Sequence, residues 1–147
     1  MLRVGLIGAG MMGEFHASGW VQTPAKLVAI HSKSREQAEK LAGKVGADII
    51  DDLDELFRAV DVVDICTPTH RHHEQVLAAA AAGKHIVCEK PLARTPQQAA
   101  EMIAACQKAG VKLLVAHVVR FFPEYAQAKE IVMSGEIGQV GVVRLKR

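Results

Sequence analysis

The chain has 147 residues, of which 50% are hydrophobic and 4% aromatic, and its formal net charge is +2. This length suits one domain with a core of its own, and the apolar content excludes an intrinsically disordered chain. The nearly balanced charge provides no basic surface for a phosphate backbone, so nucleic acid is not an expected partner. A membrane is not an expected partner either, because no apolar run approaches the roughly 20 residues of a spanning helix.

The cysteines and the N-terminus bear on the cellular compartment. Cys66, Cys88 and Cys106 are an odd number without Cys-x-x-Cys spacing, which favours a reducing compartment over a disulfide framework. The first residues, Met-Leu-Arg-Val-Gly-Leu-Ile, lead directly into a motif and lack the layout of a secretory signal peptide. We therefore expect a cytoplasmic protein.

Short apolar runs alternate with longer segments of helical periodicity along the chain. The runs have the nearly continuous hydrophobicity of parallel strands that are covered on both faces. The expected strands are 3–7, 26–31, 47–50, 62–66, 85–88 and 112–117. The expected helices are 11–21, 34–45, 52–57, 71–82, 96–109 and 123–134. This alternation predicts an α/β fold, a doubly wound parallel sheet of about six strands of the Rossmann type.

The last residues of the sequence have the pattern expected at the start of a further domain. Residues 134–138 are typical of a helix stop and a turn. In the run 140–147, Val143 and Leu145 alternate with Arg144 and Lys146, which predicts a strand with one covered and one exposed face. We expect residues 1–138 to form the Rossmann domain and residues 139–147 to begin an α+β domain that is absent from this chain.

A glycine motif follows the first expected strand and opens the first expected helix. Gly8-Ala9-Gly10-Met11-Met12-Gly13 fits the pattern GxGxxG. The first glycine allows a tight turn, the second lets a pyrophosphate approach the backbone, and the third lets helix and strand pack closely. The helix N-terminus then offers free N–H groups to the phosphates. The motif in this context predicts dinucleotide binding.

The end of the second expected strand bears on the choice of dinucleotide. An NAD site commonly places an acidic residue about 20 residues further on, where it accepts a hydrogen bond from the ribose 2′-OH. Here the segment reads Ile-His-Ser-Lys-Ser-Arg, with no carboxylate before Glu36. Ser32, Lys33 and Arg35 suit a 2′-phosphate, so NADP is the preferred cofactor and NAD is the alternative. In the other interpretation, Ser34 is a helix N-cap and the two cations are solvated residues of the first turn.

Further motifs follow the later strands. They are ICTPT at 65–69, GKHIVCEKPL at 83–92, RFFP at 120–123 and GEIG at 135–138, with FHA at 15–17. Together with the glycine motif, they make the chain resemble the N-terminal domain of the Gfo/Idh/MocA family, named after glucose-fructose oxidoreductase, inositol dehydrogenase and a rhizopine catabolism protein. The resemblance covers the whole chain, and the GKH…EKP segment is its most specific part.

The resemblance implies an NAD(P)-dependent oxidoreductase that transfers hydride between the nicotinamide and a sugar, polyol or related hydroxyl substrate. Lys90 is then the catalytic residue, which polarises the substrate hydroxyl or relays its proton. Pro91, which in this family typically follows a cis peptide bond, fixes the direction of that lysine. The implied cofactor-binding residues are Gly8, Gly10, Met11, Met12 and Gly13 at the pyrophosphate, Ser32, Lys33 and Arg35 at the adenosine ribose, Thr67, Pro68, Thr69 and His72 near the nicotinamide-side ribose and phosphates, and Glu89, Lys90 and Pro91 by the nicotinamide.

Two of these functional interpretations have a purely structural alternative. Without the resemblance, Lys90 is more typical of a surface lysine that pairs with Glu89 than of a catalytic residue. His16, on the first expected helix, is more typical of a packed or capping histidine than of a ligand.

Other polar residues lie near the ends of strands. His117 and Arg120 follow the sixth expected strand, where they would reach a substrate or contact a second domain. His70, His72 and His73 do not predict a metal site, because adjacent histidines at a helix start diverge and no cysteine or carboxylate set completes the ligands. We therefore expect no metal.

The family resemblance also implies a second domain that closes over the nicotinamide and supplies further substrate-binding residues. We therefore expect a small-molecule substrate to bind only when that domain is present. A stand-alone cofactor-binding module, or a regulator without turnover, is the competing interpretation. Apolar surface left without its partner favours a homo-oligomer, in one version a dimer that exchanges its last strand.

Overall fold

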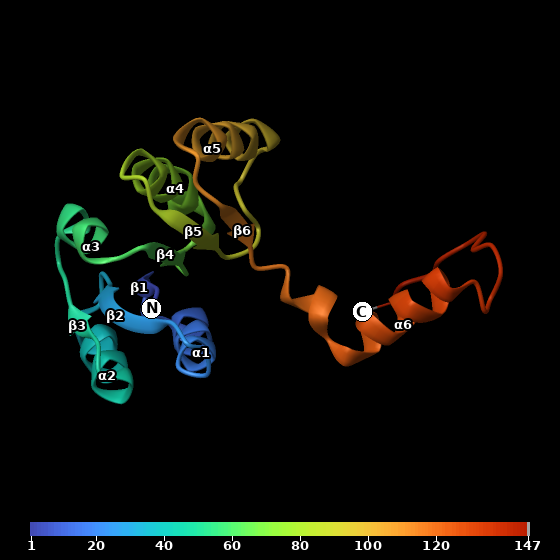
Figure 1. Cartoon of the computed structure of the whole chain (residues 1–147), viewed down its shortest axis with the longest axis horizontal. Coiled ribbons are helices and arrows are strands. Elements are labelled where there is room, and N and C mark those ends of the chain that lie inside the picture. The colour runs from blue at the N-terminus through green and yellow to red at the C-terminus, as the bar shows by residue number, and fades with distance from the viewer. Residues whose placement is uncertain (147) are drawn as a thin grey trace. The chain divides into compact units, whose positions relative to one another are not determined.

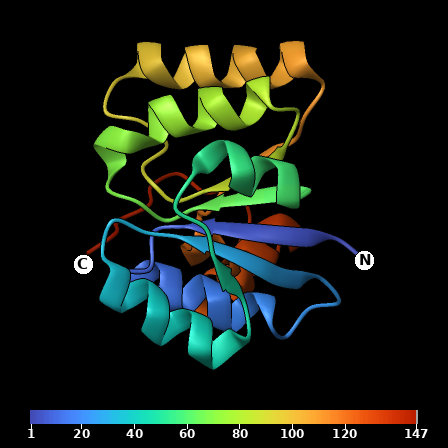
Figure 2. The same cartoon turned by 90° about the vertical axis from the view of Figure 1, so that its left-hand side faces the viewer.

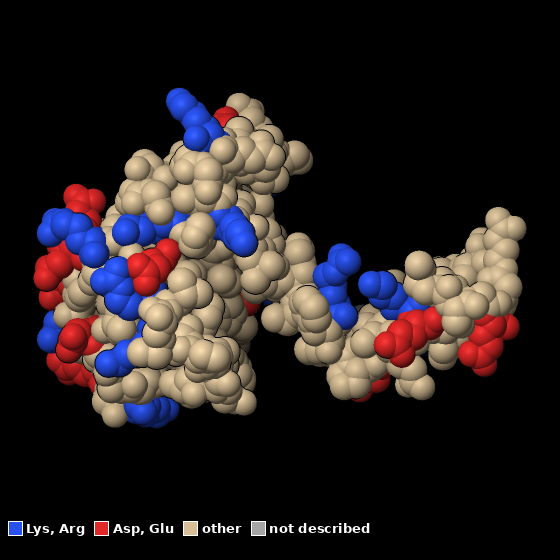
Figure 3. All heavy atoms as spheres, viewed as in Figure 1, with Lys and Arg blue, Asp and Glu red and all other residues tan. Residues whose placement is uncertain are grey.

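The computed structural model describes residues 1–146, which divide into two compact units. The first unit is Met1–Ala116, and the second begins at His117 (Figure 1). Within the described residues, none of the helices combines the length and the apolar composition that crossing a bilayer requires. On the face of the first unit that Figure 3 shows, acidic and basic side chains are interspersed, so neither sign of charge dominates that face.

A single parallel sheet organises the first unit and confirms the predicted α/β fold. Its strands are β1 (Arg3–Ile7), β2 (Lys26–His31), β3 (Asp48–Ile49), β4 (Val62–Ile65), β5 (His85–Cys88) and β6 (Leu113–Val115). They lie in the order β3-β2-β1-β4-β5-β6, and every neighbouring pair is parallel. The direction of strand addition reverses between β1 and β4, and open sheets of this type bind ligands at that point.

Helices cover both faces of the sheet. They are α1 (Met11–Trp20), α2 (Arg35–Val45), α3 (Leu53–Ala59), α4 (His72–Ala81) and α5 (Pro96–Ala109). Figure 2 shows α1 and α2 below the sheet and α3, α4 and α5 above it. Each layer has its own core of buried side chains, one built around α1 and α2 and the other around α3, α4 and α5.

The strands are apolar throughout because both of their faces are covered. In β1, Leu6 belongs to the core under α1 and α2, whereas its neighbour Ile7 belongs to the core under α3 to α5. All four residues of β4 are buried, including the polar Asp64. This burial explains why the sequence shows continuous hydrophobic runs instead of the alternation of a half-exposed sheet.

Side-chain caps fix where three of the helices begin. The hydroxyls of Ser34 and Thr95 cap α2 and α5, and the carboxylate of Asp52 caps α3 by accepting from the backbone N–H of Glu55 at 2.8 Å. A cap of this kind satisfies one of the N–H groups that have no partner inside the helix. Ser34 is therefore an N-cap, as the structural interpretation of that segment predicted.

The second unit contains a short 3₁₀ turn, η2 (Val118–Phe121), and the helix α6 (Pro123–Ser134). None of the residues of α6 is buried. The strand that we predicted at 140–147 is wrong for residues 140–146, which form no strand, and residue 147 lies outside the described residues. A strand exists only as part of a hydrogen-bonded ladder, and the described residues of this unit offer no second strand. The division into units falls after Ala116, whereas we expected a domain boundary at residue 138, which remains a prediction.

Candidate functional site

A cavity of about 610 Å³ lies at the carboxyl ends of the three central strands of the first unit. The segments that follow β1, β2 and β4 form its walls, and α2 and α4 each contribute a glutamine. It is lined by Ile7, Gly8, Ala9, Gly10, Met11, Met12, His31, Ser32, Lys33, Ser34, Gln37, Cys66, Thr67, Pro68, His70, Arg71 and Gln75. The cavity is therefore at the reversal of strand order, where the sheet topology predicts a ligand.

The glycine motif forms the turn between β1 and α1. Gly8 has φ 103°, a conformation that favours glycine, and its N–H donates to the carbonyl of His31 at 2.8 Å. A Cβ at Gly13 would lie 2.0 Å from the carbonyl oxygen of Gly8, so only glycine lets the helix start this close to the turn. At Gly10 nothing lies within 4 Å of such a Cβ, which leaves open space at the cavity wall.

The open space at Gly10 faces the start of α1. Gly10 is the N-cap of this helix, and no side chain caps it. The first N–H groups of a helix have no partner inside the helix and carry a partial positive charge. Met11 and Met12 line the cavity, and the N–H groups at the start of their helix are of the kind that suits a phosphate anion.

The segment after β2 contains the three residues that we expected at the adenosine ribose, and two of them line the cavity. Ser32 and Lys33 line the cavity, as predicted. Arg35 does not line it, because its guanidinium donates to Glu39 at 2.9 Å and to Asp51 at 3.2 Å. The cavity lining contains Lys33 and Arg71 but no aspartate or glutamate.

The segment after β4 supplies the opposite wall. Thr67 and Pro68 line the cavity, and the hydroxyl of Thr67 donates to Oε1 of Gln75 at 2.5 Å. Thr69, which opens the 3₁₀ turn η1 (Thr69–Arg71), does not line it. Gln75 could not be predicted from a motif, because a single buried glutamine on α4 belongs to none. The available signal was its position about one helical turn after the loop that follows β4.

His72 has a different place from the one that we expected beside the phosphates. It is 1% exposed and does not line the cavity. Its Nδ1 lies 3.0 Å from the carbonyl oxygen of Pro91, and its Nε2 lies 2.8 Å from the carbonyl oxygen of Thr67. The ring therefore joins the loop after β4 to the loop after β5, and no ring nitrogen is left for a ligand.

Glu89, Lys90 and Pro91 follow β5, the next strand along this edge of the sheet. Glu89 is buried, and its Oε2 accepts the backbone N–H of Lys90 at 2.9 Å. Lys90 is exposed, and the peptide bond between Lys90 and Pro91 is cis, as the family resemblance implied. These three residues lie outside the cavity lining, so their contact with a cofactor remains a prediction.

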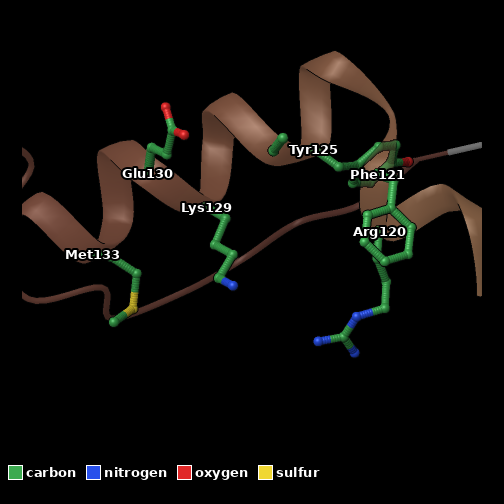
Figure 4. Close-up of a pocket in the computed structure, with 7 residues that line it drawn as sticks. Arg120, Phe121, Tyr125, Lys129, Glu130 and Met133 are labelled. Atoms are coloured by element: carbon green, nitrogen blue, oxygen red, sulfur yellow. The ribbon is translucent and has the colours of Figure 1, made fainter.

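His117 and Arg120 belong to the second unit. There Arg120 lines an open hollow of about 580 Å³ with residues of η2 and α6 (Figure 4). Figure 4 shows Lys129 and Met133 pointing to one side of α6 and Glu130 to the other. A role of His117 or Arg120 in substrate binding remains a prediction.

Comparison with known proteins agrees with this geometry. The model of the oxidoreductase family with an NAD-binding Rossmann fold, GFO_IDH_MocA, matches residues 2–117. D-glucoside 3-dehydrogenase of Escherichia coli is 40% identical over 96% of this chain, and inositol 2-dehydrogenase of Rhizobium meliloti is 37% identical over 98%. A crystal structure of an NAD binding oxidoreductase from Klebsiella pneumoniae superposes with a TM-score of 0.84, with 42% identity over 93% of this chain.

The matches cover less of the other proteins. The chain spans 42% and 44% of the two dehydrogenases and 40% of the Klebsiella chain. The region that they share with this chain contains the whole parallel sheet and the glycine turn, which together form the cavity. The chain thus belongs to the Gfo/Idh/MocA oxidoreductase family and contains that family's dinucleotide-binding Rossmann domain.

Proposed function

We propose that the chain is the cofactor-binding part of an NADP(H)-dependent oxidoreductase that acts on a hydroxyl carbon of a sugar or polyol. The observation that carries the proposal is the cavity at the reversal of strand order, with its open glycine turn and no carboxylate in its lining. Relatives named as glucoside and inositol dehydrogenases support the substrate class. A small-molecule substrate then binds with the help of the remaining part of the longer protein.

The preference for NADP over NAD rests on Ser32 and Lys33. A serine hydroxyl and a lysine ammonium can both donate hydrogen bonds to a 2′-phosphate, and the lysine also balances its charge. A carboxylate in the same place would select the 2′-OH of NAD instead, and the lining contains none. Arg35 drops out of this proposal because Glu39 and Asp51 hold its guanidinium.

Lys90 is the catalytic residue in this proposal. Its side chain is exposed at the carboxyl end of β5, while its backbone N–H is fixed by Glu89. A bound NADP⁺ would supply the hydride acceptor, and the glycine turn with Ser32 and Lys33 would hold it. The Lys90 amine takes the proton that leaves the substrate hydroxyl, and in the reverse direction the ammonium returns it.

Calorimetric titration of the 147-residue chain with NADP⁺ and with NAD⁺ tests the cofactor assignment. We expect tighter binding of NADP⁺. Lys33→Ala should weaken NADP⁺ by about 10- to 150-fold, since a hydrogen bond to a charged group contributes about 1.5–3 kcal/mol, and should leave NAD⁺ nearly unchanged. Arg35→Ala is the matched control, because it removes the same charge from outside the cavity. Equal or tighter binding of NAD⁺ would overturn the NADP assignment, and no binding of either would overturn the cofactor site.

A dinucleotide-binding module without turnover is the second candidate function. It is favoured by the cavity lining, all of which lies between residues 7 and 75 and does not include Lys90. Reduction of NADP⁺ in the presence of a polyol by the protein that contains this chain, lost in Lys90→Ala, would contradict the module. Unchanged dinucleotide binding in Lys90→Ala with no reduction by either form would favour it.

A further inference from the structure

A row of hydrogen-bonded side chains lies beneath the loop that carries Lys90. His16 of α1 is its centre, with Nδ1 2.9 Å from Oδ2 of Asp64 and Nε2 3.1 Å from Oε1 of Glu89. Trp20, one helical turn after His16, donates from Nε1 to Asp64 at 2.6 Å. Glu89 in turn accepts the backbone N–H of Lys90. The row therefore connects α1 to the ends of β4 and β5 and terminates on the backbone of Lys90.

The chemistry of this row determines which atoms donate. An ionised carboxylate only accepts hydrogen bonds, and a neutral imidazole donates from one nitrogen alone. Between two ionised carboxylates, both contacts of His16 are hydrogen bonds only if both ring nitrogens carry a proton. The buried carboxylate of Asp64, whose side chain is 0% exposed, favours this form, whereas the burial of the His16 ring, which is 12% exposed, opposes its charge. Two buried carboxylates without a cation would be strongly destabilising.

The charges around the ring act in the same direction. The pKa of His16 is raised, chiefly by its hydrogen bond to Asp64, and Glu89 adds to the effect while burial opposes it. Cys66, which follows β4, is a further titratable group against Asp64, with Sγ 3.7 Å from Oδ1, and the buried Cys88 of β5 also experiences the charges of Asp64 and Glu89. Burial and the two carboxylates raise the pKa of the Cys66 thiol, so it remains protonated.

The same atoms could be considered as metal ligands, because donor atoms of His16, Asp64 and Cys66 lie within 4.8 Å of one another. The hydrogen bonds argue against this use. Both nitrogens of His16 and both oxygens of Asp64 already have hydrogen-bond partners, and a metal would require the thiolate of Cys66. Within residues 1–146, no buried side-chain nitrogen or oxygen is left without a partner.

We propose that His16 is a positioning residue: as an imidazolium it holds Glu89 against Asp64, and through Glu89 it fixes the backbone of Lys90. The role of Lys90 rests on the proposed function, whereas the coupling of His16 to the Lys90 backbone does not. Loss of the proton from His16 removes one of its two donors, and the bond to Glu89 or to Asp64 is then broken. The Lys90 loop thereby becomes sensitive to pH through a side chain that need not touch the substrate.

Nuclear magnetic resonance of the whole 147-residue chain tests the coupling without any cofactor. The ring protons of His16 should titrate above the pKa of an ordinary histidine, and the backbone amide of Lys90 should shift with the same midpoint. In Glu89→Gln the amide of Lys90 should no longer follow the ring. His73→Gln is the control, because His73 pairs with Glu101 on the surface, and it should leave the Lys90 amide unchanged. A His16 pKa at or below that of an ordinary histidine overturns the proposal. So does a Lys90 amide whose chemical shift does not change with the titration of His16.

Ligand binding provides a second readout. His16→Gln should weaken NADP⁺ about tenfold and leave 2′,5′-ADP, which lacks the nicotinamide half, within about twofold. Lys33→Ala should weaken both ligands, because both carry the 2′-phosphate. The two variants therefore distinguish a failure of the positioning role from a failure of the NADP assignment. Equal weakening of both ligands by His16→Gln would indicate a general structural role and overturn the positioning role. If the His16→Gln variant does not fold, the nuclear magnetic resonance titration of the original chain alone tests the proposal.

Discussion

Gly13→Ala should destabilise the chain because of one backbone contact. The added Cβ would lie 2.0 Å from the carbonyl oxygen of Gly8, whereas real Cβ atoms essentially never approach closer than 3.0 Å. The first turn of α1 therefore has to retreat by about 1 Å or more from the glycine turn. Because the obstacle is backbone, no side-chain rotation can relieve it.

The magnitude follows from two opposing effects. Overpacking of this kind costs about 1–3 kcal/mol. Replacing glycine by alanine inside a helix returns about 0.5–1 kcal/mol. Taking the middle of each range, we expect the free energy of unfolding to fall by about 1 kcal/mol, which for a chain of this size lowers the Tm by about 2–4 °C.

Thermal and urea denaturation of the 147-residue chain measure this loss. Gly19→Ala is the matched control, because Gly19 lies in the same helix and its added Cβ meets nothing within 4 Å. This control should raise the stability by up to about 1 kcal/mol. A Gly13→Ala chain as stable as the original, or a Gly19→Ala chain that loses as much, would refute the reasoning.

Further expectations concern a cap, a thiol and the effect of pH. Asp52→Ala should lower the free energy of unfolding by about 1 kcal/mol in urea denaturation, and Asp52→Asn should recover most of it; equal losses would contradict the cap. Cys88, whose pKa burial raises to about 12, should resist iodoacetamide at pH 8 in the folded chain and react in urea, as followed by mass spectrometry; rapid modification of the folded chain would be inconsistent with this burial. Because the folded pKa of His16 is raised, its contribution to stability is full below the ordinary histidine value of 6.5 and is lost as pH rises through the raised pKa. The stability difference between the original chain and His16→Gln should therefore shrink from pH 6 to alkaline pH, and a constant difference would disprove it.

The sequence predicted the fold well because its signals are local and repeated. Continuous apolar runs marked all six strands, and the cap at Ser34 marked the start of α2. Boundaries at the outer strands were less accurate: β3 is only Asp48–Ile49 and β6 only Leu113–Val115. An outer strand pairs on one side only, so its ends depend on its single neighbour more than on its own residues.

The site was predictable where it follows a motif and not where it depends on distant partners. The glycine turn, Lys33 and Thr67 line the cavity as expected. Arg35 does not, because Asp51, 16 residues away, binds it. The sequence predicts a packed or capping histidine at His16 but not its partners, because nothing near it in the sequence indicates Asp64, 48 residues away, or Glu89, 73 residues away. Only the folded sheet brings those three elements together.

The pairing of β1 with β4 has a consequence for how the chain folds. Val4 lies opposite Val62, so the two strands that form the centre of the sheet come from segments separated by the whole of α1, β2, α2, β3 and α3. Closing so long a loop is slow, and the cavity does not exist before it closes. A dinucleotide therefore stabilises the chain only when the sheet is complete and does not stabilise partly formed sheets. At a concentration of 100 times its Kd it raises the free energy of unfolding by about 2.7 kcal/mol. The cofactor then acts chiefly on the unfolding rate, and the occupied chain should open more slowly without folding faster.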